Sequence, residues 1–309
     1  MTVIHGLENI SQEPNGRVLA VGVFDGVHWG HRAVFEKLLT VAERAHLTSA
    51  VLTFERHPAE LLSPTRSPDY INTLDQRIEL IEAAGVREIT VADFTPELAS
   101  LPHQRFVETV LLHTLNAKHV VVGSNFRFGK GRKGDVRSLT SAAPKLGFDL
   151  TVVPAVIVGG EPVSSTRVRA LIGRGDVADA SRLLGRRFAL RGDVVMGEQL
   201  GRTLGFPTAN VHTAARQLLP ATGVYAVEVT LDLTTYGGVC NIGSRPTFGG
   251  GGGESVEVHL AGFQDDIYGR TIDVVFLRRL RDEMVFESPE HLADQIRQDL
   301  ERAKPSFEQ

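Results

Sequence analysis

Residues 18–39 read "VLAVGVFDGVHWGHRAVFEKLL", and this stretch decides the class of fold. Its first seven residues form a nearly continuous apolar run, which is typical of a strand covered on both faces. Apolar residues then recur at helical spacing, at Val34, Leu38, Val41 and Ala45. A buried strand that leads directly into an amphipathic helix predicts the start of an alternating α/β domain.

The same alternation continues through the first half of the chain. After the helix over 31–47, strands are expected over 49–54, 87–94, 119–123 and 149–156, and helices over 75–85 and 103–115. Strands that alternate with helices pair in parallel through right-handed crossovers, so we expect an open, doubly wound, Rossmann-like sheet. Ligands of such sheets bind beyond the carboxyl ends of the strands, where the strand order reverses.

The pattern changes near residue 186. Short strand-like runs punctuated by glycine and proline follow, which predicts an antiparallel β-barrel or sandwich. A closing helix is expected to begin at the N-cap Ser288 with Pro289 in its first turn, with its acidic residues on a solvated face. The predicted domains are therefore 1–185 and 186–309, and the five-glycine run 249–253 is expected to be a flexible loop.

Composition sets limits on the class of protein. The chain has 309 residues, 42% of them hydrophobic and 23% charged, which is typical of a globular protein of two domains. The net charge of -4 provides no overall attraction to nucleic acid or to an anionic membrane. A single cysteine, Cys240, excludes an internal disulfide and fits a reducing cytoplasm, and neither a leader peptide nor a membrane span is expected.

Two histidines follow the first strand. His28 and His31 lie at a strand's carboxyl end and at a helix N-terminus, where backbone N–H groups favour anions. Phosphate handling, a structural role at the turn and metal chelation all stay open on spacing alone. The metal interpretation is the weakest because no carboxylate or cysteine of suitable spacing accompanies the pair.

Two later segments favour phosphate handling. The loop "GSNFRFGKGRKGD" (123–135) combines aromatic and basic residues that could hold a ring by stacking and a phosphate by charge, although a solvated basic loop has the same composition. The segment "VSSTRVRALI" (163–172) places hydroxyls and arginines at a predicted helix start. That arrangement suits a pyrophosphate leaving group, and it also suits an ordinary N-cap.

These motifs together resemble the nucleotidyltransferase superfamily. "GVFDGVHWGH", "TFERHP", "GSNFRFG" and "SSTRVR" are similar to the N-terminal half of bacterial bifunctional riboflavin kinase/FAD synthetases, with Glu55 and Arg56 standing where many relatives have aspartate and proline. The resemblance implies that His28 and His31 stabilise phosphate charge. It also implies an ATP- and flavin-binding set: Gly22, Phe24, Asp25, Gly30, Asn125, Phe126, Arg127, Ser164, Ser165, Thr166 and Arg167.

The second half provides a kinase motif. "GEQLGRTLGFPTAN" (197–210) ends with Thr208 and Asn210, whose oxygens face one side of an extended chain and suit Mg²⁺ bound to ATP, although Thr-Ala-Asn alone is more often a turn. With "NIGSRPTF" and "VEVHL" it resembles the riboflavin kinase barrel, and no P-loop motif occurs. The resemblance implies that Glu257 is the general base, although a glutamate on an alternating strand could instead simply face solvent. It also implies a nucleotide- and flavin-binding set: Gly197, Arg202, Gly205, Pro207 and Arg281.

The expected activity is bifunctional. Riboflavin and ATP give FMN, and FMN and a second ATP give FAD and pyrophosphate, with Mg²⁺ accompanying the nucleotide. We expect a cytoplasmic enzyme whose partners are small molecules, not nucleic acid or membrane, and a homo-oligomer is left open. Three alternatives stay open: one retained activity beside a flavin- or nucleotide-binding module, a regulatory binding protein without turnover, and a nucleotidyltransferase with another substrate.

Overall fold

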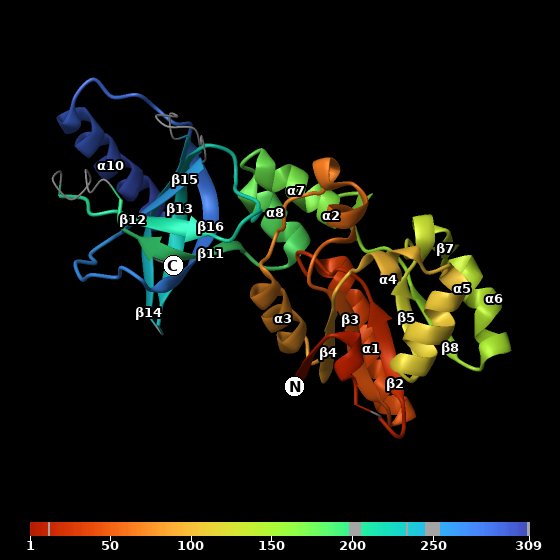
Figure 1. The fold of residues 1–309 in the computed structure, drawn as a ribbon. Helices are drawn as coiled ribbons and strands as arrows, with labels where there is room; N and C mark the ends of the chain where they lie inside the picture. Colours follow the sequence, from red (N-terminus) through yellow and green to blue (C-terminus); the bar gives the residue numbers. More distant parts are fainter. Residues whose placement is uncertain (12, 198–204, 233, 245–253, 308–309) are drawn as a thin grey trace. The chain divides into compact units, whose positions relative to one another are not determined.

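The computed structural model describes every residue except 12, 198–204, 233, 245–253 and 308–309 (Figure 1). It divides into two units, one of Met1–Asp69 with Leu74–Ser164 and one of Tyr70–Thr73 with Ser165–Gln309. The helices α7 (Ser165–Gly173) and α8 (Val177–Leu184) thus group with the second unit, ahead of the change of sequence pattern at residue 186. The five-glycine run and Arg202 lie outside the described residues.

A six-stranded parallel sheet forms the centre of the first unit, in the order β1-β4-β3-β2-β5-β8. The predicted doubly wound sheet is therefore confirmed. The edge strand β1 was not predicted, because a run of four residues is too short to show a periodicity. The six strands are Thr2–His5 (β1), Arg17–Val21 (β2), Thr48–Phe54 (β3), Glu88–Ala92 (β4), Ala117–Gly123 (β5) and Asp149–Val153 (β8).

Helices cover both faces of this sheet. On one face α1 (Trp29–Ala45) and α3 (Leu74–Ala83) bury Phe35, Leu38 and Ile81. On the other face a π-helix over Phe106–Thr114 and the helix α6 (Val136–Leu146) close a second core. The remaining short elements are Leu7–Asn9 (η1), Pro58–Leu62 (α2), Pro64–Arg66 (η2), Pro96–Ser100 (α4), His103–Arg105 (α5), Arg127–Phe128 (β6), Lys130–Arg132 (η4), Gly134–Asp135 (β7), Ile157–Val158 (β9) and Glu161–Pro162 (β10).

A closed barrel of six antiparallel strands forms the centre of the second unit, in the order β11-β12-β15-β14-β13-β16. Tyr225, Cys240 and Val258 are opposed across three neighbouring strands and fully buried, so burial raises the pKa of the Cys240 thiol. The strands are Phe188–Val195 (β11), Ala209–Thr213 (β12), Gly223–Leu231 (β13), Thr234–Ser244 (β14), Glu254–Leu260 (β15) and Thr271–Arg281 (β16). The predicted barrel is confirmed.

The terminal helix α10 (Pro289–Ala303) lies along the outside of the barrel (Figure 1), and a short 3₁₀ turn, η5 (Lys304–Ser306), follows it. Ser288 caps α10 as predicted, and its hydroxyl accepts from the His291 N–H at 3.3 Å. The prediction of a uniformly solvated acidic face is wrong at Asp299, which is 1% exposed. Its carboxylate accepts hydrogen bonds from the Arg281 guanidinium, and this pairing makes burial of the charge tolerable.

Four residues of the first half of the chain belong to the second unit. The Tyr70 N–H donates to the Arg216 carbonyl, and the Leu218 N–H donates to the Tyr70 carbonyl, both at 2.8 Å. The Arg186 guanidinium also donates to the Asn72 side chain at 2.9 Å. Nothing in the local pattern of this segment indicated a partner more than a hundred residues away, because such pairing depends on the chain path and not on periodicity.

Removal of Glu88 should destabilise the protein strongly. Its carboxylate accepts from the Arg17 guanidinium at 2.6 Å, and the Arg17 side chain is fully buried at the start of β2. Glu88→Ala leaves that charge without its carboxylate, so the free energy of unfolding should fall by about 3 kcal/mol in denaturant titration. The exposed pair of Arg105 and Glu108 provides the control. Glu108→Ala should change the free energy of unfolding by less than about 0.5 kcal/mol. Equal effects of the two substitutions would contradict this account.

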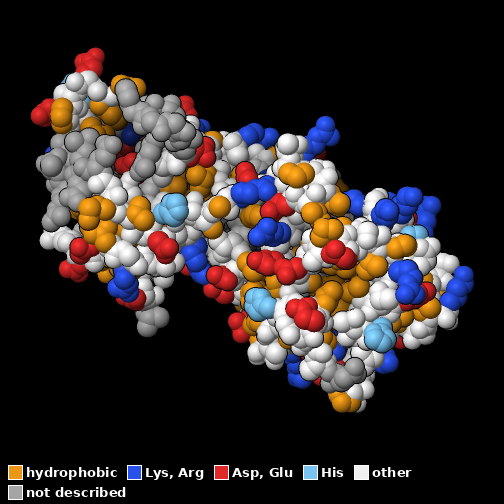
Figure 2. Space-filling model, in the orientation of Figure 1, with side chains coloured by type: hydrophobic (Ala, Val, Ile, Leu, Met, Phe, Trp, Pro, Cys, Tyr) orange, Lys and Arg blue, Asp and Glu red, His pale blue; other side chains and the backbone are white. Residues whose placement is uncertain are grey.

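Charges of both signs are interspersed over much of the visible surface (Figure 2). No helix within the described residues combines the length and the hydrophobicity that crossing a membrane requires.

Candidate active sites

The turn after β2 is strained. Phe24 and Val27 have φ angles of 53° and 38°, and Gly26 between them has a φ of 86°. Side chains other than glycine rarely adopt this left-handed region, and it costs about 1–3 kcal/mol at each such residue. Phe24 and Val27 are 5% and 1% exposed in the core beneath α1, so their burial holds the turn in place.

The two predicted histidines lie together at the start of α1. His28 is the N-cap, and its Nδ1 accepts from the His31 backbone N–H at 3.3 Å. The rings stack with centroids 3.7 Å apart, and the Phe24 ring meets His31 edge-on at 5.2 Å. Because Nδ1 of His28 is an acceptor, the neutral ring carries its proton on Nε2, where it can donate to an anion. The structure therefore brings His28 and His31 together at a helix N-terminus.

Gly30 allows this close packing. A Cβ at residue 30 would lie 3.1 Å from Cε1 of His28 and 3.7 Å from the Val163 carbonyl oxygen. The chain just before Ser164 thus passes beside the histidine turn. Ser164 closes the first unit, whereas Ser165, Thr166 and Arg167 begin α7 in the second unit, at the helix start predicted for them.

A second loop leaves the same edge of the sheet. β2 and β5 are neighbours in the centre of the sheet. β3 and β4 lie on the far side of β2, and β8 lies on the far side of β5, so the strand order reverses between β2 and β5. The loops after these two strands carry the histidine turn and the predicted residues Asn125, Phe126 and Arg127. Asn125 is exposed, the Phe126 ring stacks on Phe128, and Arg127 pairs with Asp135 at 2.8 Å. This is where ligands of doubly wound sheets bind.

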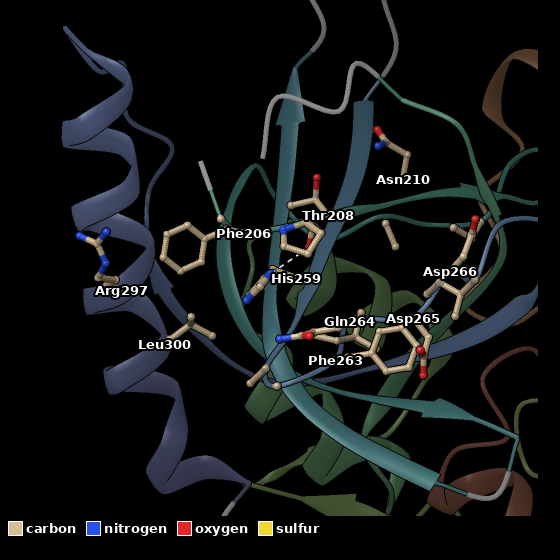
Figure 3. A pocket seen from close by; sticks show the side chains of 18 of the residues that line it. Phe206, Thr208, Asn210, His259, Phe263, Gln264, Asp265, Asp266, Arg297 and Leu300 are labelled. Atoms are coloured by element: carbon tan, nitrogen blue, oxygen red, sulfur yellow. Dashed lines mark hydrogen bonds between the residues drawn. The ribbon is translucent and has the colours of Figure 1, made fainter. Parts of the chain in front are cut away.

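A cavity of about 850 Å³ lies on the barrel (Figure 3). It is lined by the segment 205–210, by β15 and the loop that follows it, and by one side of α10. Figure 3 shows Phe206 between Arg297 of α10 and His259 of β15, and the Arg297 guanidinium lies 5.6 Å from the Phe206 ring centroid. The lining includes four predicted kinase residues: Gly205, Pro207, Thr208 and Asn210.

The predicted metal ligands lie at one end of this cavity. Thr208 and Asn210 both line it, as does Ala209 between them, and their shared role at Mg²⁺ stays a prediction (Figure 3). Gly197 packs against Asn210, since a Cβ at residue 197 would overlap the Asn210 side-chain amide. Within the described ranges no three His, Cys, Asp or Glu side chains form a metal site. A hydroxyl and a carboxamide oxygen nevertheless suit Mg²⁺ that keeps phosphate oxygens as its other ligands.

Strand register places the predicted base beside these residues. Glu257 is directly opposite Asn210 on one neighbouring strand and opposite Asn241 on the other. Directly opposed residues project on the same face of a sheet, with Cβ atoms about 4.5–5.5 Å apart. Glu257 and Asn210 are 47 positions apart in the sequence, and only the pairing of β12 with β15 makes them neighbours.

Arg281 lies in the same cross-strand row but is already engaged. The row continues from Asn241 to Val224 and then to Arg281, three strands from Glu257. Its guanidinium binds Asp299 and lies 5.8 Å from the Phe286 ring centroid. The packing of α10 therefore accounts for this arginine, and a contact with flavin stays a prediction.

His259 is a cavity residue that sequence reasoning did not single out. Its Nδ1 donates to the Pro207 carbonyl at 2.9 Å, which leaves Nε2 as the acceptor, and its ring meets Phe206 edge-on. Burial lowers the pKa of His259, so the imidazole stays neutral at physiological pH. The histidine of "VEVHL" lies two residues after Glu257 on an alternating strand, and this spacing could have placed it on the same face.

Comparisons with known proteins identify the family of each half of the chain. Residues 10–167 match the family model of FAD synthetase, and residues 184–307 match that of riboflavin kinase. The chain is 41% identical over 309 residues to the bifunctional riboflavin kinase/FMN adenylyltransferase of Escherichia coli K12, covering 99% of this chain and 98% of the relative. It belongs to this bifunctional family.

Other relatives extend the same result. The enzyme of the same name from Bacillus subtilis is 36% identical, covering 97% of this chain and 96% of the relative. A crystal structure described as a macrolide-efflux protein from Streptococcus pneumoniae has a TM-score of 0.90 and 34% identity, covering 98% of this chain and 99% of that one. The expected family, with its riboflavin kinase and FMN adenylyltransferase activities, is confirmed.

Proposed function

We propose that the two activities are divided between the sites described above. The edge of the parallel sheet carries FMN adenylylation, and the barrel carries riboflavin phosphorylation, with the catalytic domains divided at 185/186. The observation that supports this division most directly is the convergence of Asn210 and Glu257 on neighbouring barrel strands, in a different unit from the histidine turn. The proposed partners are the small-molecule substrates riboflavin, FMN and ATP, and the proposed location is the cytoplasm.

In the adenylyltransferase site, a phosphate oxygen of FMN attacks the α-phosphorus of ATP and pyrophosphate leaves. His28 and His31 donate from their rings to the phosphate oxygens on which charge develops, and the N-terminus of α1 adds its positive end. Neither histidine forms a bond to phosphorus in this scheme. Their contribution is positioning and electrostatics, which the N-cap bond and the ring stacking hold in place.

In the kinase site, Glu257 removes the proton from the terminal ribityl hydroxyl as that oxygen attacks the γ-phosphorus of ATP, and ADP leaves. Thr208 and Asn210 would hold the Mg²⁺ that accompanies ATP, which supplies charge neutralisation when bound. Phe206 provides an apolar surface for the base of the nucleotide, and Nε2 of His259 provides an acceptor for an exocyclic amine.

Flavin analysis tests the whole proposal. Incubation with riboflavin, ATP and Mg²⁺ should yield FMN first and FAD later, in chromatography of samples taken over time. A chain that retained only one activity would stop at FMN, or would make FAD only from added FMN. Support for both activities comes from the pairing of His28 with His31 in the first unit and from the lining of the barrel cavity by Thr208 and Asn210 in the second.

Replacement of His259 should weaken the kinase for ATP. His259→Phe keeps an aromatic ring against Phe206 but removes the Nε2 acceptor and the Nδ1 hydrogen bond to the Pro207 carbonyl, so KM for ATP in FMN formation should rise about tenfold. Adenylylation of added FMN should not change, because His259 belongs to the barrel. An unchanged KM would show that the base of ATP does not bind at this end of the cavity.

The same residue should make stability depend on pH. The pKa of His259 in the folded protein is below that in the unfolded chain, so on acidification the unfolded chain takes up the proton first. The free energy of unfolding should therefore fall as pH drops below about 6.5 through the lower folded pKa. Urea titrations at pH 7.5 and at pH 5 measure this effect. The decrease in the free energy of unfolding between the two pH values should be smaller for His259→Phe than for the unaltered protein.

A further inference from the structure

A buried arginine joins the ends of the two strands beside the histidine turn. Arg77, in the first turns of α3, is 2% exposed. Its Nη1 donates to the Val23 carbonyl at 2.9 Å, and its Nη2 donates to the Phe54 carbonyl at 2.5 Å and to the Glu55 carbonyl at 3.3 Å. One guanidinium thus ties the carboxyl end of β2 to that of β3.

Val23 is the last residue before the strained turn. Phe24, with its φ of 53°, follows directly, and His28 is five positions from Val23. The Val23 carbonyl accepts from Arg77 and also from the Thr53 hydroxyl at 3.0 Å. Two donors therefore hold the orientation of the peptide from which the left-handed turn starts, and a displacement there would shift both histidines.

The charge of Arg77 also suits this place. The oxygens of the Val23 and Phe54 carbonyls are partially negative and lie at the carboxyl edge of the sheet, where ligands of doubly wound sheets bind. Arg77 caps two neighbouring strands at that edge with a guanidinium, which is always protonated. Burial of a cation costs several kcal/mol. A neutral donor could satisfy the carbonyls without that cost, so hydrogen bonding alone does not account for an arginine here.

We propose that Arg77 is a positioning residue of the adenylyltransferase site. It holds the Val23 and Phe54 carbonyls so that the strained turn presents His28 and His31 to the phosphates, and it reduces the repulsion between the sheet edge and those phosphates. This inference rests on the proposed role of the two histidines.

The test compares Arg77→Met and Arg77→Lys in the full chain. With FMN and ATP supplied, Arg77→Met should lower kcat for FAD formation by about 100-fold, the loss typical of a misplaced catalytic group. Arg77→Lys, whose ammonium can reach one carbonyl, should recover about tenfold of that loss. FMN formation by the same preparation should change less than twofold, which serves as the internal measure of folded protein.

Two further variants refine the test. Thr53→Val is close in shape and removes only the second donor to the Val23 carbonyl, so it should lower FAD formation several-fold in the same direction. Arg87→Met, an exposed arginine of the same unit, should leave both activities unchanged. Full FAD formation in Arg77→Met, or an equal loss of both activities, would overturn the proposal.

Histidine NMR separates this inference from the function on which it rests. In Arg77→Lys the ring resonances of His28 and His31, which stack on each other, should shift, while the exposed His113 should not. Unshifted rings would contradict the positioning role. Shifted rings together with full activity of a His31→Ala variant would uphold the positioning role and reject the proposed role of the histidines.

Discussion

FMN should accumulate and FAD should fail to form when His31→Ala is incubated with riboflavin, ATP and Mg²⁺. The substitution removes a ring that the structure holds against His28 and Phe24 at the N-terminus of α1. Loss of one preorganised donor to developing phosphate charge typically costs about 10²–10³ in rate. FAD formation should fall by about 10³, at the upper end of that range, because the His31 ring also supports the ring of His28. Chromatography of the flavins at fixed times measures both steps in one sample.

His28 requires a different substitution because it has two roles. It caps α1 in addition to its proposed role at the phosphates, and alanine would lose about 1 kcal/mol of capping along with the ring. His28→Asn keeps a side-chain acceptor for the cap, so its loss of FAD formation should reflect the missing ring. His113→Ala, an exposed histidine of the same unit, is the control and should affect neither step. If His31→Ala halts FMN formation equally, the assignment of the two sites is wrong.

Glu257→Gln should give the opposite phenotype. Riboflavin should remain unphosphorylated, while added FMN should still be converted to FAD at the normal rate. The carboxamide has nearly the shape of the carboxylate and keeps the position opposite Asn210, but it cannot accept the proton of the ribityl hydroxyl. Loss of a general base costs about 10²–10⁴ in rate, and initial rates of FMN formation at saturating ATP should show it as a change in kcat.

The matched control lies on the same strand. Glu254 begins β15 and is exposed, so Glu254→Gln removes an equal charge three residues away and should leave FMN formation unchanged. A similar loss in both variants would mean that the effect comes from the charge of the strand and not from proton removal. Retention of kcat in Glu257→Gln would exclude this residue as the base.

Much of the fold could be predicted because its signals are local. The central strands of the sheet contain short apolar runs, such as Val18–Val21 in β2 and Val120–Val122 in β5, which periodicity detects. β1 was missed because its four residues are too few to show a pattern. The burial of Asp299 was missed because helical periodicity does not show that Arg281 of another element supplies the compensating charge.

By itself the sequence determined the alternation of strands and helices, the change to a barrel, and the motifs that carry His28 and Asn210. These are consequences of residue spacing, which local backbone geometry converts directly into structure. Only the tertiary structure decided that Glu257 is opposite Asn210 and that Arg77 joins the ends of β2 and β3. Such neighbours depend on strand register and on helix packing, which the whole core determines and no short stretch of sequence encodes.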